Sequence, residues 1–539
     1  MTQSIPNDDY YLTYFLRMID VVDQRYNDIL DDDVCYFIQQ VRACSRPSLR
    51  LLIRLYMRKG PNFLADRLQY AEVPDIEFAI DELSDLELLQ RNPEVYAFEL
   101  IDLLPVARSR ELFGHDRKTR KTDLYEQWLD DEQCQPCQDW GLNEPVVTPL
   151  DYDSLRRIQL LFFGNDHQDI TEFILEDLGL FRYESMPLDK ANRLFDSSKT
   201  IDQYLLLNDL RSEFYLMNDA RDYSNLAELV EQALQISLPD TLVPKWHRFL
   251  NRLAYRLEQL GELPLALGLF ETNDLPPARE RRVRIYTKLE RYEEANALLA
   301  HIEAHPRSSD EVQFYRRFVN KLRRLCGDSK LNLAPPPITE HTVVWPKGDA
   351  CVELLACEQL PGAVWLENRL PLAIFGLLYW PVIFADVPGV WQHPFQAAPT
   401  DLNDAVFASR RQNLIDQLAS QSKPQWRSAI CQTWEEKQGI RNPFVHWSAL
   451  DLDTVLVCFD ALEQPQWQGI FDHLLTDLRQ YRSGFPDLFQ AHEGQHRFIE
   501  IKGPGDKLQD NQIAWLTVFA RLGIPADVLY VRYESDDTL

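Results

Sequence analysis

The sequence predicts a multidomain protein that is mainly α-helical over its first two thirds and α/β from about residue 340 onward. The chain has 539 residues, too many for one hydrophobic core, and about 100–200 residues per domain gives three or four domains. Helix-like apolar spacing recurs up to about residue 330, whereas strand-like alternation appears near the C-terminus. Three consecutive prolines within residues 334–338 mark the boundary, because they cannot continue a helix.

The first basic helix follows an acidic helical segment. Arg50, Arg54 and Arg58 are spaced to share one helical face, and Gly60-Pro61 ends that helix. Such a helix is typical of a helix-turn-helix or winged-helix DNA-binding unit, but a solvated basic face explains it equally well. Both interpretations stay open at this point.

A second basic cluster lies in a predicted loop between two helical segments. Its members are Arg108, Arg110, Arg117, Lys118, Arg120 and Lys121. A net charge of −28 argues against general polyanion binding, so any DNA contact has to be confined to basic islands of this kind. Arg117, Lys118, Arg120 and Lys121, with the three arginines of the first basic helix, are therefore candidate phosphate contacts.

Paired amphipathic helices are predicted between about residues 225 and 333. Two segments align so that Ala266 matches Ala295 and Leu263 matches Tyr292, with small residues where helices cross. This pattern is similar to tetratricopeptide repeats, with a slightly shorter period. Clusters of Arg and Lys at 279–284 and 316–324 add basic faces that could follow a duplex, although solvated faces are the default.

Several segments exclude other classes of protein. The start of the chain lacks a basic stretch followed by an apolar run, so a cytosolic protein is expected rather than a secreted one. The apolar stretch Leu370–Phe384 is too short to span a bilayer and contains two prolines, which favours a buried core helix and no membrane contact. Cys134 and Cys137 lack the further ligands of a zinc site, and the cysteines are expected to be reduced thiols.

The last part of the chain carries the clearest chemistry. Apolar spacing predicts a helix over 467–478, strands over 485–489 and 496–502, a helix over 513–522 and a strand over 528–533. Because side chains alternate along a strand, Glu500 and Lys502 lie on one face and Ile499 and Ile501 on the other. Asp487 precedes them by a distance that two antiparallel strands and a turn can close.

Two carboxylates and one ammonium at a common point suit phosphodiester hydrolysis. Asp487 and Glu500, with the Ile501 backbone carbonyl, are hard oxygen ligands for Mg²⁺ or Mn²⁺, as one or two ions. Lys502 would orient or help to deprotonate the attacking water or stabilise developing charge, and Gln512 would help to hold that water or Lys502. A surface salt bridge would explain an isolated Asp and Glu-x-Lys set, so the surrounding sequence decides between them.

That surrounding sequence resembles a known nuclease family. RSGFPDLF at 482–489, FIEIKGPGDKL at 498–508 and QDNQIAWL at 509–516 are similar to the PD-(D/E)xK superfamily, and to its virus-type replication-repair nuclease (VRR-NUC) domain in particular. Upstream, VWLENR at 364–369, GLLYWPVIF at 376–384 and PFQAAPTDL at 394–402 followed by SRR resemble the Fanconi-associated nucleases, in a length typical of bacterial members.

The resemblance implies a structure-selective nuclease in DNA interstrand crosslink repair. It implies endonuclease cleavage near 5′ flaps, 5′-to-3′ exonuclease action, branched or 5′-flap DNA as partner, and a restriction-endonuclease-like fold for the last domain. It also implies that a helical glutamate joins the metal site, and Glu367 matches that position. Dimerisation on DNA is left open, and the expected location is the cytoplasm, at the bacterial nucleoid, or the nucleus of a eukaryote.

The expected domains follow from these patterns and the resemblance. They are an N-terminal helical segment (1–45), a helix-turn-helix-like DNA-binding unit (46–125), a helical SAP-like DNA-binding region (126–224), tetratricopeptide-like helices (225–333) and the VRR-NUC domain (340–539). Two alternatives remain: a restriction or defence nuclease that cuts duplex DNA, and a non-enzymatic helical scaffold with a degenerate nuclease domain.

Overall fold

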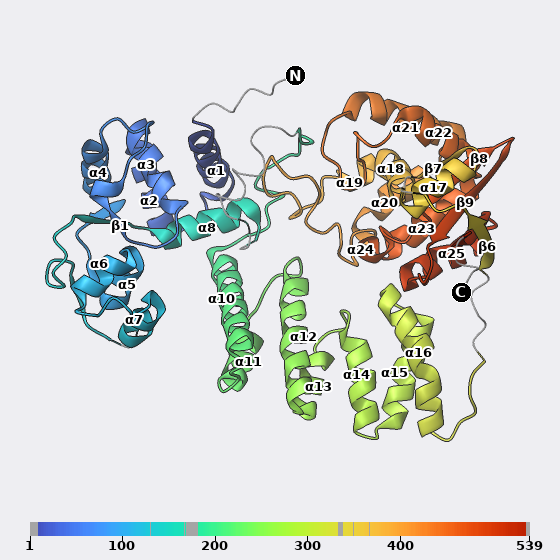
Figure 1. Ribbon diagram of the computed structural model, residues 1–539, viewed down its shortest axis with the longest axis horizontal. Coiled ribbons are helices and arrows are strands. Elements are labelled where there is room, and N and C mark those ends of the chain that lie inside the picture. The colour runs from blue at the N-terminus through green and yellow to red at the C-terminus, as the bar shows by residue number, and fades with distance from the viewer. Residues whose placement is uncertain are drawn as a thin grey trace. The chain divides into compact units, whose positions relative to one another are not determined.

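Two units make up the chain in the computed structural model (Figure 1). One comprises residues 1–181 and 188–201, and the other comprises residues 182–187 and 202–539. The structure describes residues 9–129, 131–165, 168, 182–332, 338–348, 350–365 and 367–534. Within these ranges no helix is both long enough and apolar enough to cross a membrane, and all nine cysteines are free thiols.

The first unit begins with helices packed on a small sheet. Its helices are α1 (Tyr10–Tyr26), α2 (Asp32–Ala43), α3 (Arg46–Tyr56), α4 (Ile76–Asp85) and α8 (Tyr152–Phe163). Antiparallel strands β1 (Phe63–Leu64), β5 (Val146–Pro149) and β2 (Leu89–Arg91) form the sheet in that order. The expected basic helix is α3, which ends at Tyr56, shortly before Gly60 (φ +91°) and Pro61 as expected; β1 and a 3-10 turn follow before α4.

A second group of elements follows in the same unit. It contains β3 (Glu94–Tyr96), α5 (Ala97–Leu103), α6 (Val106–Leu112), α7 (Lys121–Trp128) and β4 (Cys134–Pro136). Leu100, Leu104, Leu142 and Cys137 pack together in its core, so Cys137 acts as a small apolar residue. Residues 113–120 form the loop that was expected between two helical segments.

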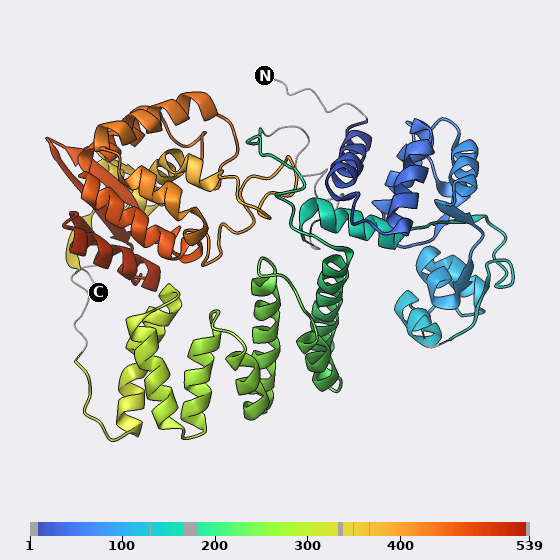
Figure 2. The same ribbon diagram turned by 180° about the vertical axis from the view of Figure 1, so that it is seen from behind.

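The helical repeats form the first part of the second unit. After α10 (Ser198–Ala220), which crosses from the first unit, come α11 (Leu226–Leu234), α12 (Val243–Leu260), α13 (Leu263–Glu271), α14 (Ala278–Lys288), α15 (Tyr292–Ala304) and α16 (Ser309–Leu325). Helices α12 to α16 follow one another in a row in both views (Figure 1, Figure 2). Ala266 and Ala295 are fully buried, which confirms that both small residues lie where helices pack closely.

A mixed sheet forms the centre of the C-terminal part. Its strand order is β6 (Thr339–Trp345), β10 (Ala526–Tyr533), β9 (Gln495–Lys502), β8 (Leu488–His492) and β7 (Ala363–Trp365). Strand β10 pairs in parallel with β6 and β9, whereas β8 pairs antiparallel with β9 and β7. The strands expected over 496–502 and 528–533 are confirmed as β9 and β10, whereas the one expected over 485–489 begins three residues later as β8; β6 and β7 are additions that the sequence pattern did not indicate. The proline-rich boundary at 334–337 lies outside the described residues.

The helices of this part surround the sheet. They are α17 (Val352–Gln359), α18 (Arg369–Leu378), α19 (Trp380–Ile383), α20 (Gln412–Ala419), α21 (Lys423–Lys437), α22 (Leu452–Ala461), α23 (Gln464–Thr476), α24 (Leu478–Tyr481) and α25 (Asp510–Leu522). The apolar stretch Leu370–Phe384 is buried in the core as expected, apart from exposed Pro381. It forms two helices rather than one, because Pro381 cannot donate the backbone hydrogen bond that would continue α18.

Candidate active site

Strand β9 delivers Glu500 and Lys502 to one face of the sheet. Ile499 and Ile501 point the other way into the apolar core, which fixes the register of the strand. Glu500 is 1% exposed and Lys502 is 7% exposed, so both charged groups are buried. Lys502 Nζ lies 2.8 Å from Glu500 Oε1. The charge of the ammonium therefore offsets part of the cost of burying the carboxylate.

Asp487 joins this pair from the residue just before β8. Leu488 lies opposite Ile499 in the antiparallel ladder, which places Asp487 beside the end of β9. The Ile501 backbone N–H donates to Asp487 Oδ2 at 2.9 Å, between the two charged residues of β9. The predicted convergence of Asp487, Glu500 and Lys502 is therefore present in the structure.

Burial and mutual repulsion perturb both carboxyl groups. Desolvation raises the pKa of Asp487 to about 6, although the hydrogen bond from the Ile501 N–H and the charge of Lys502 both act to lower it. Desolvation, followed by the charge of Asp487, raises the pKa of Glu500 to about 8, against lowering by Lys502. Glu500 Oε2 is buried without a hydrogen-bond partner. The site holds more negative charge than one ammonium can balance, which is the electrostatic condition for binding a cation.

Glu367 lies beside Asp487, but it is not on a helix. Its backbone N–H donates to the Asp487 carbonyl at 2.9 Å, and its charge contributes to the raised pKa of Asp487. It occupies a turn with φ +46° between β7 and α18, so the expectation of a helical glutamate at this position is wrong. The next residue, Asn368, accepts the Phe485 N–H at 3.0 Å. These bonds tie the turn to the segment that ends at Asp487.

The helical carboxylate near the site is Glu353, which the sequence reasoning missed. It lies in the first turn of α17, and its charge raises the pKa of both Asp487 and Glu500. An acidic residue in the first turn of a helix is common because it favours the helix dipole. That ordinary explanation conceals its proximity to the site, which the sequence alone does not indicate.

Gln512 contacts Glu500 rather than Lys502. Its Nε2 donates to Glu500 Oε1 at 2.5 Å, and its Oε1 accepts the Gln509 backbone N–H at 2.9 Å in a capping box. Gln512 therefore fixes one oxygen of Glu500 and the start of α25 together. The expectation that it would hold Lys502 is replaced by this contact.

The chemistry of the residues at this point fits a divalent cation. Carboxylate and backbone carbonyl oxygens are the ligands that Mg²⁺ and Mn²⁺ prefer, and the unpartnered Glu500 Oε2 leaves one such ligand available. Among the described residues, no group of three His, Cys, Asp or Glu side chains is arranged to hold a metal ion. Asp487, Glu500 and the Ile501 backbone carbonyl are the oxygen ligands that this point of the sheet offers, and the charge of Glu367 lies close enough to raise the pKa of Asp487.

The three arginines of the first basic segment are engaged within the first unit, but only Arg50 and Arg54 lie on α3, because the helix ends at Tyr56 and the expectation that Arg58 shares its face is wrong. Arg50 pairs with Asp9 at 2.6 Å, Arg54 pairs with Glu72 at 2.7 Å, and Arg58 donates to the Tyr70 hydroxyl at 3.1 Å. These contacts give the face a structural role, since each pair joins α3 to a neighbouring segment. Their role as phosphate contacts stays a prediction.

The basic loop after α6 is more open. Arg117 and Lys118 are exposed, whereas Arg120 pairs with Asp123 at 2.8 Å and Lys121 donates to the Asp102 carbonyl at 2.8 Å. Arg117 and Lys118 therefore remain candidates for a phosphate contact in this unit, and their role stays a prediction.

The arginine cluster of α14 in the second unit pairs with acidic residues. Arg279 and Glu311 form a buried pair at 2.5 Å, and Arg281 binds Glu258 at 2.7 Å. These residues hold neighbouring repeats together, so a face of free arginines along a duplex is not what this helix presents.

Comparison with known proteins places the site in a family context. Residues 421–533 match the family model described as VRR-NUC domain, and residues 9–90 match the model described as FAN1, HTH domain. The chain is 32% identical to a Fanconi-associated nuclease 1 homolog of Pseudomonas aeruginosa, over 99% of this chain and 98% of that protein. It is 23% identical to the human Fanconi-associated nuclease 1, over 97% of this chain but only 62% of the human protein.

Solved structures agree with the sequence comparisons. The chain is similar to a crystal structure of paFAN1 bound to DNA with a two-nucleotide 5′ flap and a gap. The TM-score is 0.85 and the identity 32%, over 99% of this chain and all of that one. A second paFAN1 structure, with a one-nucleotide 5′ flap, gives a TM-score of 0.82.

Proposed function

Because the chain belongs to the Fanconi-associated nuclease 1 family, we propose that it cuts branched DNA at 5′ flaps with Mg²⁺ or Mn²⁺. It is a structure-selective DNA nuclease with a VRR-NUC domain, and this family type generally uses divalent metal ions. The observation that carries the proposal is the buried Asp487, Glu500 and Lys502 cluster, with its excess of negative charge, inside the matched domain.

The residues of the site divide the chemical work. Asp487, Glu500 and the Ile501 carbonyl would hold the metal, and Glu367 would complete its ligands. A divalent ion in such a site polarises the scissile phosphate and lowers the pKa of a bound water. Lys502, already held 2.8 Å from Glu500, orients the attacking water or stabilises the charge that develops on the phosphate.

Gln512 and the Ile501 N–H supply order rather than charge. Each holds one carboxylate oxygen, of Glu500 and Asp487 respectively, so the other oxygen of each carboxylate stays available to a metal ion. Holding ligands in place before the substrate arrives lowers the cost of reaching the transition state.

The 5′-flap specificity and the biological role belong to the proposal. Two similar structures, both named as bound to 5′-flap DNA, support a flap as the substrate of this chain. The 5′-to-3′ exonuclease action and the role in interstrand crosslink repair rest on family membership. Dimerisation on DNA and a location with the chromosome are further expectations of the same kind.

Cleavage of matched DNA substrates tests the proposal. We expect the protein to cut a labelled 5′ flap faster than nicked or blunt duplex, only with a divalent ion present. Asp487→Ala and Glu500→Ala should abolish cutting while flap binding persists, because binding uses other residues. Equal cutting of blunt duplex at one sequence, or retained cutting by either variant, would reject the assignment.

A further inference from the structure

Helix α16 of the repeats contacts two helices next to the active site: α24, which shortly precedes Asp487, and α25, which carries Gln512. The first turn of α16 meets α24: Ser309 lies beside the Asp477 carboxylate, which accepts the backbone N–H of Gln480 at 3.1 Å, and beside the Tyr481 hydroxyl. Gln480 Nε2 also donates to Asp310 Oδ2 at 3.3 Å. Ser309 is 7% exposed, so this end of α16 is buried against the other helix.

The segment that α16 holds leads directly to Asp487. The Tyr481 carbonyl accepts the Trp515 indole N–H at 3.1 Å, and the Phe485 ring stacks on Trp515 at 3.8 Å. Gly484 follows with φ +93°, where a Cβ would meet the Asn511 backbone at 2.7 Å. A shift of α24 therefore passes to Asp487 through a short, closely packed piece of chain.

A second contact from α16 reaches the start of α25. Arg317, two turns along α16, forms an ion pair with Asp510 in the first turn of α25. Asp510 is two residues before Gln512, whose amide fixes Glu500 Oε1 at 2.5 Å. One helix of the repeats thus holds both the segment of Asp487 and the helix of Gln512.

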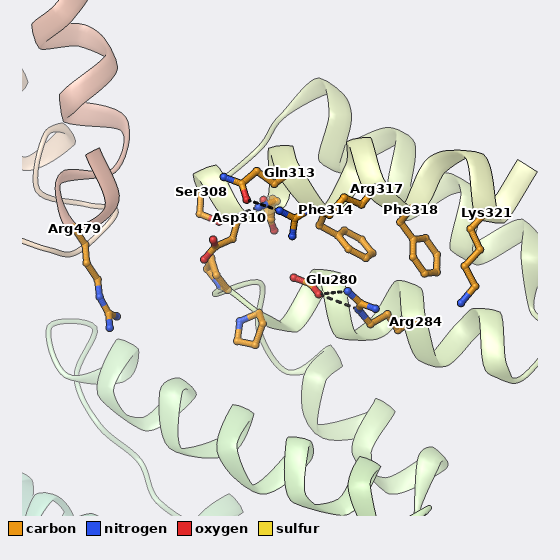
Figure 3. A pocket seen from close by; sticks show the side chains of 13 residues that line it. Glu280, Arg284, Ser308, Asp310, Gln313, Phe314, Arg317, Phe318, Lys321 and Arg479 are labelled. Atoms are coloured by element: carbon orange, nitrogen blue, oxygen red, sulfur yellow. Dashed lines mark hydrogen bonds and ion pairs between the residues drawn. The ribbon is translucent and has the colours of Figure 1, made fainter. Parts of the chain in front are cut away.

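The two contacts are separate points rather than one continuous interface. A cavity of about 600 Å³ lies beside them, lined by Asp310, Arg317 and Arg479 among others. Figure 3 shows Asp310 and Arg317 along α16, with Arg479 on the other side of this cavity. Arg317 and Asp510 are 67% and 51% exposed, so their pair contributes little to stability and can be removed without unfolding the protein.

We propose that α16 positions the nuclease site, with Arg317 as a positioning residue that acts through Asp510 on Gln512 and Glu500. The inference rests on the proposed function and adds that the helical repeats are part of the catalytic unit rather than a spacer. Because a metal site tolerates displacements of only fractions of an ångström, a loosened α25 lowers turnover without weakening DNA binding.

A double-mutant cycle on the flap substrate tests the proposal. The variants are Arg317→Ala, Asp510→Asn, both together and Arg317→Lys, with Arg324→Ala as the control on an exposed residue of the same helix. We expect Arg317→Ala to lower kcat about five-fold with KM and melting temperature unchanged, since misplacement of a reacting group costs rate rather than binding. The kcat of the double variant should fall no further than that of the more impaired single variant. Arg317→Lys and Arg324→Ala should keep full kcat.

The outcomes separate this inference from the function itself. Wild-type protein that cuts the flap, beside an inactive Asp487→Ala variant, establishes the nuclease in the same assay. Unchanged kcat in Arg317→Ala would then overturn the positioning role alone. A raised KM with unchanged kcat would assign Arg317 to DNA contact, and strictly additive losses would show that Arg317 and Asp510 act independently; either result overturns the proposal.

Discussion

Replacing Asp487 by asparagine removes one negative charge from the site and keeps its shape. The amide oxygen can still accept the Ile501 N–H, which Asp487 Oδ2 now accepts at 2.9 Å. Without metal, the variant should unfold less easily than the wild type at neutral pH, although it cannot cut DNA. Buried carboxylates that repel one another destabilise the fold when no cation is bound, so replacing one of them by a neutral amide stabilises it.

The magnitude and sign follow from the pKa of the carboxyl group. Burial raises the pKa of Asp487 from 3.8 to about 6. At about 1.4 kcal/mol per pKa unit, the ionised carboxylate costs the metal-free fold roughly 1–3 kcal/mol once partial exposure is allowed for. The folded pKa of Asp487 is higher than the unfolded one, so folding favours the protonated carboxyl group. As far as this group is concerned, the wild-type protein therefore keeps its full stability below pH 3.8 and loses roughly these 1–3 kcal/mol as the pH rises from there through about 6.

Thermal unfolding at two pH values measures the effect. With a chelator present, Asp487→Asn should melt about 3 °C above the wild type at pH 7.5, and above it by about half that difference at pH 5, which lies between the unfolded and folded pKa of the carboxyl group. Mn²⁺ should then raise the melting temperature of the wild type but not of the variant, since only the wild type gains binding energy. A variant that melts below the wild type at pH 7.5 without metal would refute the argument.

Three further substitutions probe residues around the site, and a fourth serves as a control for the last of them. Glu353→Gln should raise the Mn²⁺ concentration for half-maximal cleavage about tenfold, because a neighbouring carboxylate strengthens the cation site, and an unchanged requirement would leave it only a role in helix α17. Gln512→Ala should slow single-turnover cleavage about tenfold with flap affinity unchanged; parallel loss of affinity would contradict its role as a support for the metal ligand. Gly484→Ala should lower the free energy of unfolding in urea by about 3 kcal/mol, from positive φ and the clash with Asn511. Gly505→Ala, with φ +88° and open space, should lose only about 1 kcal/mol, and equal losses would contradict the clash.

Local sequence patterns were enough to predict the centre of the nuclease domain. The alternation of Ile499 and Ile501 with Glu500 and Lys502 specifies β9 and its two faces, and the turn at 492–494 closes the hairpin with β8. Once that hairpin forms, Asp487 has to lie near the end of β9. The site could therefore be found from residues close together in the chain.

The features that the sequence patterns did not predict depend on contacts between segments far apart in the chain. Strand β6 has little apolar alternation because most of its side chains are exposed, and its partner β10 lies far along the chain. The basic helix α3 shows the same limit. Arg50 and Arg54 read as candidate DNA contacts in sequence, but their partners Asp9 and Glu72 come from other segments. Glu353 likewise reaches the site only through the packing of α17 on β7 and β9.

The parallel pairing of β10 with both β6 and β9 has a consequence for protein synthesis. Strand β9 emerges from the ribosome before β10, and β6 emerges long before it. At about 5–20 residues per second, β6 waits roughly 10–40 seconds for its partner. Strand β9, with Glu500 and Lys502, is made late in that interval and lacks the strand beside it until β10 follows, so the site of a nascent chain is incomplete until then. The helical parts can fold first, and the sheet of the nuclease domain is complete only once residue 533 has left the ribosome.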